Sequence, residues 1–178
     1  MTPHAPPVLP DLLMPGLLVV FCGTAAGTQS ARRGHYYAGP GNKFWRMLHE
    51  TGLTPRRLVP RKASELPALG IGLTDLAKHT SGPDASLRPE HLDLAAAVAR
   101  LRVARPRILA FNGVKAARLW LGQPTGPVRL GAMPDPHRVA DQLVALPSTS
   151  GAAGGTWDEK PWHQLGRTVR AIRAGVSP

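Results

Sequence analysis

The chain has 178 residues, with 22 Lys and Arg residues against 11 Asp and Glu residues, so its formal net charge is +11 at neutral pH. This length suits one domain with its own hydrophobic core, and a hydrophobic content of 43% is too high for a disordered chain. No apolar run approaches the roughly 20 residues of a membrane-spanning helix, and no secretory signal pattern opens the sequence. The excess of cations predicts an anionic partner, most often nucleic acid.

The first half of the chain predicts two regular elements separated by a long loop. Residues 1–16 form a proline-rich lead-in for which no element is expected. The apolar run over 17–22 is typical of a strand buried on both faces, and the glycine-rich stretch over 23–42 predicts a loop. Apolar side chains at helical spacing over 43–50 predict a helix.

The second half of the chain alternates helices with strands. The expected elements are, in order, a helix over 89–101, a strand over 107–111, a helix over 114–121, a strand over 142–146 and a helix over 158–174. This alternation predicts a single α/β domain over residues 17–175, in which helices flank a mostly parallel central sheet in three layers.

Three predicted strands end in segments that can hold a ligand. In an open parallel sheet, ligands bind beyond the carboxyl ends of the strands, which here are followed by 23–42, 112–113 and 148–155. Two of these segments are poor in bulky side chains, so that a flat group or a phosphodiester could approach the backbone closely. Flexible turns are the alternative interpretation.

Five motifs span most of the chain: VFCGTAAGT over 20–28, RGHYYAGPGNKFW over 33–45, GIGLTD over 70–75, PRILAFNG over 106–113 and LPSTSG over 146–151. In this order they resemble the mismatch-specific uracil-DNA glycosylase and thymine-DNA glycosylase family, within the uracil-DNA glycosylase superfamily. The resemblance implies a cofactor-free enzyme of base-excision repair that flips uracil, thymine or a related base out of mismatched double-stranded DNA and hydrolyses its N-glycosidic bond. The positive charge would then contact phosphates.

One motif departs from the family pattern. The family's first motif is typically Gly-x-Asn-Pro-Gly, whose Asn positions the attacking water, whereas this chain has Ala25 at the Asn position. A methyl group can neither orient nor deprotonate water. Two interpretations follow: the chain is a catalytically impaired protein that binds damaged DNA and keeps the base pocket, or another residue activates the water.

Asp75 is the leading candidate for that role. It ends the apolar, glycine-bounded segment 70–75, which the resemblance places beside the base pocket. A carboxylate there can act as a general base on water, and its charge can stabilise an oxocarbenium-like transition state. A helix N-cap or a solvated loop carboxylate is the alternative interpretation, and Asp93 is the second candidate for the base.

The remaining site residues follow from the resemblance. The expected base pocket consists of Thr24, Ala25, Ala26, Gly27, Tyr37, Asn42 and Asn112. Tyr37 matches the aromatic residue that stacks on the flipped base, although a core tyrosine is the alternative. Backbone groups after Gly23 would read the edge of the base. A helix N-cap explains Asn42 equally well, and a turn explains Asn112.

The second family motif grips phosphates and fills the gap that the flipped base leaves. Its counterparts here are Ser148, Thr149, Ser150, Gly151, Ala152 and Ala153. The two alanines lie where other members carry bulkier or basic wedge residues, which predicts weak dependence on the opposite base. Ser148 and Ser150 can instead be ordinary turn residues.

The other reactive side chains predict little further chemistry. The seven histidines show no metal-ligand spacing, so neither a metal nor a cofactor is expected. Cys22 is expected to be a buried strand thiol rather than a nucleophile. A single cysteine cannot form an internal disulfide, and we expect a cytoplasmic, monomeric protein, associated with the nucleoid if it is bacterial.

Overall fold

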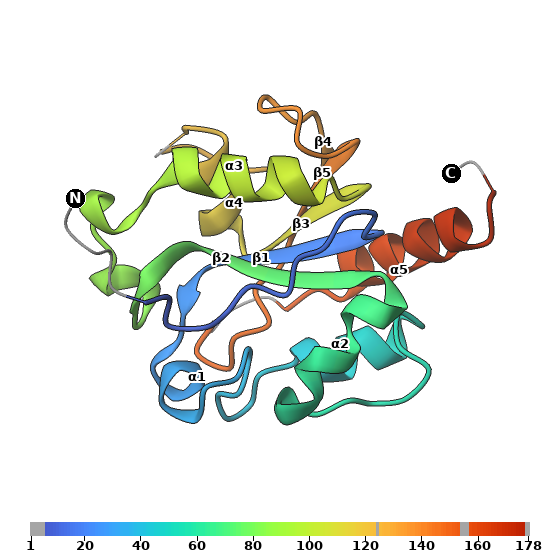
Figure 1. Ribbon diagram of the computed structural model, residues 1–178, viewed down its shortest axis with the longest axis horizontal. Helices are drawn as coiled ribbons and strands as arrows, with labels where there is room; N and C mark the ends of the chain where they lie inside the picture. Colours follow the sequence, from blue (N-terminus) through green and yellow to red (C-terminus); the bar gives the residue numbers. More distant parts are fainter. Residues whose placement is uncertain (1–5, 124, 154–156, 177–178) are drawn as a thin grey trace.

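The computed structural model describes residues 6–123, 125–153 and 157–176. A five-stranded sheet with the strand order β2-β1-β3-β5-β4 lies at its centre (Figure 1). Its strands are β1 (Val19–Ala26), β2 (Ile71–Ser81), β3 (Ile108–Asn112), β4 (Gly131–Met133) and β5 (Gln142–Leu146). All neighbouring pairs are parallel except β4 with β5. The predicted α/β fold with a mostly parallel sheet is confirmed.

Helices cover both faces of this sheet, so the three predicted layers are present (Figure 1). The α-helices are α1 (Thr28–Arg33), α2 (Phe44–Glu50), α3 (Leu94–Ala104), α4 (Val114–Trp120) and α5 (Lys160–Arg173). Short 3-10 helices are η1 (Pro60–Glu65), η2 (Pro67–Leu69), η3 (Asp84–Ser86) and η4 (Pro89–His91). On the side of α2 and α5 one core cluster surrounds Phe21, Phe44 and Trp162, and on the side of α3 and α4 a second surrounds Phe111 and Trp120.

Two segments differ from the expectation in ways that matter for the site. The first strand continues to Ala26, and α1 lies inside the expected loop, where its sequence TQSARR has no apolar periodicity to reveal it. The segment that carries Asp75 is a strand of eleven residues, β2, although Gly72 and the charged residues interrupt its apolar pattern. The helix expected from residue 89 begins as η4 and continues as α3 only from Leu94.

The N-terminal lead-in packs on the sheet instead of preceding it. β2 is an edge strand, and its free edge is covered by residues 8–12. The backbone N–H of Val8 donates to the carbonyl of Lys78 at 2.7 Å, and Leu12 exchanges two backbone hydrogen bonds with Leu73. The Leu9 side chain is buried in the core. Residues 8–12 therefore belong structurally to the domain that was expected to begin at residue 17, because an edge strand needs partners for its free N–H and C=O groups.

Within the described ranges, no helix is both long and apolar enough to span a bilayer.

Candidate active site

The candidate site is a row of three residues across neighbouring strands, which we call the strand row: Asp75 on β2, Gly23 on β1 and Asn112 on β3. Asp75 is paired with Gly23 in the parallel register, and Asn112 lies one residue beyond the pair of Cys22 with Phe111. Because neighbouring residues in a parallel sheet share a face, all three lie on the face of the Phe21 and Phe44 cluster.

Gly23 leaves the space that the Asp75 carboxylate occupies. A Cβ atom at position 23 would lie only 2.6 Å from Oδ1 of Asp75, which is closer than non-bonded atoms approach. Any other residue at this position would therefore displace the carboxylate. The first glycine of the motif thus has a steric role toward a side chain 52 positions later in the sequence.

Asp75 is buried, and its environment makes it a proton acceptor near neutral pH. The pKa of its carboxyl is raised from 3.8 to about 7, mainly by burial and to a smaller extent by the nearby negative charge of Asp11. The cations of Lys78 and Arg100 lower the pKa and oppose this effect. A carboxylate with a pKa near the working pH combines ionisation with useful basicity, which suits a general base.

Tyr37 lies near Gly23, on the face of the sheet that packs against the Phe21 and Phe44 cluster. Its ring stacks on Phe44 with 3.9 Å between the ring centroids, and its backbone has a left-handed φ of 52°, which is uncommon outside glycine. The hydroxyl oxygen would lie 3.7 Å from a Cβ at position 23, so it borders the same position as the Asp75 carboxylate.

The Tyr37 hydroxyl is buried, and within the described part of the chain it makes no hydrogen bond of normal geometry. Burial raises the pKa of this hydroxyl well above its usual value, and the charge of Asp75 adds to the increase, whereas the side chain of Asn112 lowers the pKa. A neutral hydroxyl without a strong partner therefore faces the strand row.

Asn112 and Thr149 hold each other through two hydrogen bonds. The Asn112 amide donates to the Thr149 hydroxyl at 2.7 Å, and its carbonyl oxygen accepts from the Thr149 backbone N–H at 2.9 Å. The Thr149 side chain is fully buried, so the prediction that it grips DNA does not fit its position. It fixes the loop after β5 to the end of β3 instead.

The loop over 148–153 lies against the segment before α2. The Lys43 N–H donates to the carbonyl of Thr149 at 2.9 Å, and a Cβ at Gly151 would lie 2.6 Å from the carbonyl oxygen of Pro40. Ser148 and Ser150 accept local backbone hydrogen bonds, as turn residues do. Gly151, Ala152 and Ala153 are exposed.

The other predicted base-pocket residues lie near the end of β1 and before α2. Ala25 is half-buried and lies on the same face as Gly23, while Thr24 and Ala26 are buried and Gly27 is exposed. The Asn42 side chain accepts a hydrogen bond from the Phe44 N–H at 3.0 Å in the turn before α2. The N-cap of α2 is Lys43, so Asn42 lies one residue before the position that the alternative interpretation assigned to it.

Two further candidates have structural explanations. Asp93 is exposed, and its carboxylate accepts a hydrogen bond from the Ala96 N–H at 2.8 Å as the N-cap of α3. Cys22 is fully buried, and burial raises the pKa of its thiol well above the usual value, which disfavours the nucleophilic thiolate. Asp75 is thus the remaining candidate for the base among those that the sequence analysis named.

Sequence reasoning missed the charged residues that surround Asp75. Lys78 is buried, and it forms an ion pair with Asp11 at 2.7 Å. Arg100 forms a second ion pair with Asp11 and donates a hydrogen bond to the backbone carbonyl of Asp75. The sole signal for Lys78 is a charge that ends an apolar run, and Asp11 gives no signal in a lead-in for which no element was expected.

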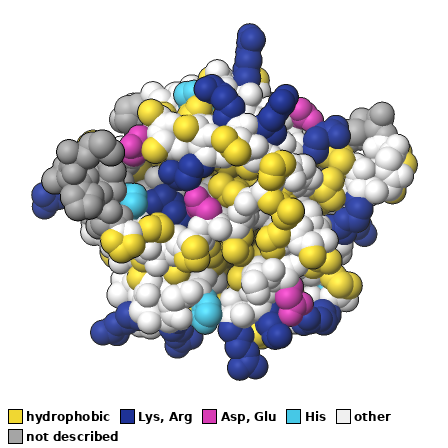
Figure 2. Space-filling view, viewed as in Figure 1, with side chains coloured by type: hydrophobic (Ala, Val, Ile, Leu, Met, Phe, Trp, Pro, Cys, Tyr) yellow, Lys and Arg dark blue, Asp and Glu magenta, His cyan; other side chains and the backbone are white. Residues whose placement is uncertain are grey.

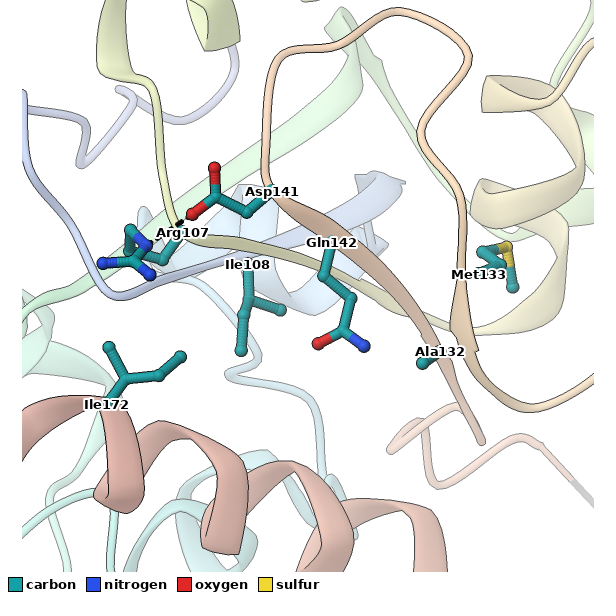
Figure 3. A pocket seen from close by; sticks show the side chains of 7 residues that line it. All are labelled: Arg107, Ile108, Ala132, Met133, Asp141, Gln142 and Ile172. Atoms are coloured by element: carbon teal, nitrogen blue, oxygen red, sulfur yellow. Dashed lines mark hydrogen bonds and ion pairs between the residues drawn. The ribbon is translucent and has the colours of Figure 1, made fainter. Parts of the chain in front are cut away.

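A cavity of about 470 Å³ lies away from the strand row. Its walls include Arg107, Ile108, Gln142 and Ile172, so it borders the amino-terminal ends of β3 and β5 and the end of α5 (Figure 3). The strand row and the 148–153 loop lie toward the opposite, carboxyl ends of the strands. This cavity is therefore separate from the candidate site.

The charges on the surface match the basic composition. On the face that Figure 2 shows, Lys and Arg side chains are spread along the rim and outnumber the acidic side chains. Among the residues that the structure describes, no three His, Cys, Asp or Glu side chains come together as a metal site would require.

The fold and the site define the class: an α/β protein with a buried carboxylate in its parallel sheet, next to loops at the carboxyl ends of the strands. A family model described as the Uracil DNA glycosylase superfamily matches residues 10–166, and the chain belongs to this superfamily. Membership implies a DNA glycosylase, which is a hydrolase with DNA as its substrate. The assignment to the mismatch-specific branch stays a prediction.

A solved structure shares the fold. The chain is similar to the solution NMR structure of a putative uracil DNA glycosylase from Methanosarcina acetivorans, with a TM-score of 0.58 and 24% sequence identity. The similarity covers 91% of this chain and 96% of the other. It supports the three-layer architecture.

Proposed function

We propose that this protein removes uracil from mismatched double-stranded DNA and leaves an abasic site, with Asp75 as the general base. The observation that carries this proposal is the buried Asp75 carboxylate, with a pKa of about 7, in the space that Gly23 leaves free. Thymine and related damaged bases remain within the proposed substrate class.

The proposed reaction is a hydrolysis. A water molecule beside Asp75 gives a proton to the carboxylate while its oxygen forms a bond to C1′ of the flipped nucleotide. The C1′–N bond breaks, and its electron pair leaves with the base. Until it takes up the proton, the carboxylate charge also stabilises the positive charge that develops on the sugar.

The base itself would be held by residues above the strand row. We assign stacking to the face of the Tyr37 ring opposite Phe44, since Phe44 stacks on the other face. Backbone N–H groups over 24–27 would donate to the base oxygens and stabilise the departing anion. Asn112 would act mainly by holding Thr149, because both the nitrogen and the oxygen of the Asn112 side-chain amide form hydrogen bonds with Thr149.

Ala25 defines the alternative function. Its side chain cannot hold water as the Asn of the family does, so a protein that binds damaged DNA without cleaving the glycosidic bond is the second candidate. Asp75 favours catalysis because it supplies a proton acceptor on the same face, two positions from Ala25 across the strand pair. Release of uracil distinguishes the two functions.

We also propose that the enzyme is monofunctional, without lyase activity. A lyase needs an uncharged lysine amine to attack the sugar. Lys78 is the buried lysine near the site, and its ammonium group contacts Asp11, the carbonyl of Leu9 at 2.6 Å and the Tyr36 hydroxyl at 3.1 Å. These three contacts hold the Lys78 side chain at the edge of β2.

The decisive experiment is an abasic-site cleavage assay on duplexes that contain one uracil. We expect the wild type to release uracil under single-turnover conditions and Asp75→Asn and Asp75→Ala to be at least 100-fold slower. Asp141→Asn is the matched control, because it removes an exposed carboxylate at the other end of the sheet. Undiminished release by Asp75→Asn contradicts the catalytic role, and tight binding of damaged duplexes without release by the wild type indicates the binding protein.

A further inference from the structure

We propose that the N-terminal segment is part of the reaction site, with Asp11 as a positioning residue that neutralises Lys78 and Arg100 beside Asp75. The inference rests on the proposed role of Asp75. It assigns a function to a segment that lies outside every motif of the sequence analysis, and it explains why three charged residues are gathered at the edge of β2.

The segment reaches this place through the backbone. Residues 8–12 run along the free edge of β2, and the hydrogen bonds of Val8 to Lys78 and of Leu12 to Leu73 fix their register. Asp11 is consequently held beside Thr74, whose hydroxyl donates to Oδ1 of Asp11 at 2.7 Å. Thr74 directly precedes Asp75 in the strand.

Asp11 divides its two carboxylate oxygens between two cations. Oδ1 forms the ion pair with Lys78 at 2.7 Å, and Oδ2 forms the ion pair with Arg100 at 3.1 Å. Lys78 is 6% exposed and Asp11 20% exposed, so solvent screens this pair weakly. A buried ammonium without such a partner would be unfavourable, so the ion pair with Asp11 stabilises Lys78 at this position.

Both cations also act on Asp75. Arg100 donates a hydrogen bond from its guanidinium to the backbone carbonyl of Asp75 at 3.1 Å, which fixes this part of the strand. The positive charges of Lys78 and Arg100 lower the pKa of the Asp75 carboxyl, whereas the negative charge of Asp11 raises it. The two cations alone would make Asp75 a stronger acid and therefore a weaker base.

The other titratable groups near Asp75 carry no charge at neutral pH. These are Cys22 on β1 and the two tyrosines before α2, Tyr36 and Tyr37, and burial raises the pKa of each well above its usual value. Among the described residues, the charge around Asp75 is thus set by Asp11, Lys78 and Arg100.

Two substitutions with opposite expected effects test the proposal. Asp11→Asn keeps the shape and a hydrogen-bond acceptor for Thr74 but removes the negative charge, and Lys78→Met removes the positive charge and keeps the chain length. The Asp75 carboxyl is titrated by its ¹³C chemical shift, assigned through the loss of its signal in Asp75→Asn. We expect the midpoint to fall by about one pH unit in Asp11→Asn and to rise by about one unit in Lys78→Met.

The pH profile of uracil release gives a second readout. We expect the midpoint of the single-turnover rate to shift in the same directions, while the affinity for the duplex changes less than 3-fold. Asp141→Asn is the control for charge, because its carboxylate pairs with Arg107 on the surface. If Lys78→Met does not fold, Arg100→Gln replaces it, since Arg100 is partly exposed and its loss also raises the midpoint.

A purely structural role makes a different prediction. Folded variants of Asp11 and of either cation that keep the wild-type midpoint overturn the inference, whatever their rates. The titration does not require catalysis, so it separates this result from a failure of the proposed function. If the titration midpoint of Asp75 shifts as expected but the protein does not release uracil, the result contradicts the proposed glycosylase reaction and leaves the role of Asp11 standing.

Discussion

Gly23 lies directly opposite Asp75 in the parallel pairing of β1 with β2, and a Cβ at position 23 would come within 2.6 Å of Oδ1 of Asp75. We therefore expect Gly23→Ala to move the carboxylate and to lower the single-turnover rate of uracil release at least 10-fold. The matched control is Gly39→Ala, since a Cβ at position 39 would meet no atom within 4 Å. A wild-type rate in Gly23→Ala would contradict the proposed role of the space beside Gly23.

The raised pKa of Asp75 predicts the pH dependence of catalysis. A general base works in its ionised form, so the rate should rise with pH up to a midpoint near 7 and then level off. Rates measured between pH 5 and pH 9 under single-turnover conditions test this. Asp75→Asn should be much slower, and its rate should no longer rise between pH 5 and pH 7. A wild-type rate that is constant from pH 5 to pH 9 would exclude Asp75 as the base.

The same pKa predicts a cost in stability. The folded state binds the Asp75 proton more tightly than the unfolded chain, so the free energy of unfolding should decrease as pH rises from about 3.8 through about 7. The shift corresponds to a loss of at most about 4 kcal/mol through this group. Urea unfolding of the wild type and Asp75→Asn at pH 5 and pH 8 measures this loss. Relative to the wild type, the unfolding free energy of Asp75→Asn should be higher at pH 8 than at pH 5. An equal difference at both pH values would contradict the prediction.

The two hydrogen bonds between Asn112 and Thr149 predict a structural role for a residue of the second motif. Thr149→Val keeps the buried shape but leaves the Asn112 amide without its hydroxyl partner, so we expect a loss of about 1–3 kcal/mol in unfolding free energy. Thr168→Val, which removes a hydroxyl from the solvent side of α5, should change stability by less than about 0.5 kcal/mol. Thermal unfolding compares the two, and equal effects would contradict the buried role of Thr149.

The sequence singled out a candidate site residue where few residues of its type were present, and it predicted strands where the pattern lies within one short segment. Asp75 could be singled out because few carboxylates were available, and the apolar runs of β3 and β5 predicted those strands. The sheet partners of Asp75 could not be predicted, since pairing between β1 and β2 joins residues about 50 positions apart. The contacts of Asp11 depend on the register of a segment without any apolar periodicity.

The roles of Asn112 and Thr149 show the same limit for side chains. Both residues lie in motifs that pointed to DNA or base contacts, yet each uses its polar atoms on the other. A sequence pattern identifies residues near a site, but it does not say which of them face the ligand and which hold the others. Burial of Thr149 decides that question, and burial is a property of the packed loop.

The small, exposed side chains of the 148–153 loop predict how the enzyme depends on the opposite base. Ala152 and Ala153 are small and exposed. In the wedge role expected from the resemblance, they would fill the gap left by a flipped nucleotide poorly and contact the opposite base weakly. We expect uracil release from U·G, U·A and single-stranded DNA to differ by no more than about 10-fold, apart from the lower cost of flipping a mismatched base. Ala152→Arg should increase the preference for double-stranded substrates by adding a wedge and a phosphate contact. Strict selectivity of the wild type for U·G pairs would contradict this interpretation of the loop.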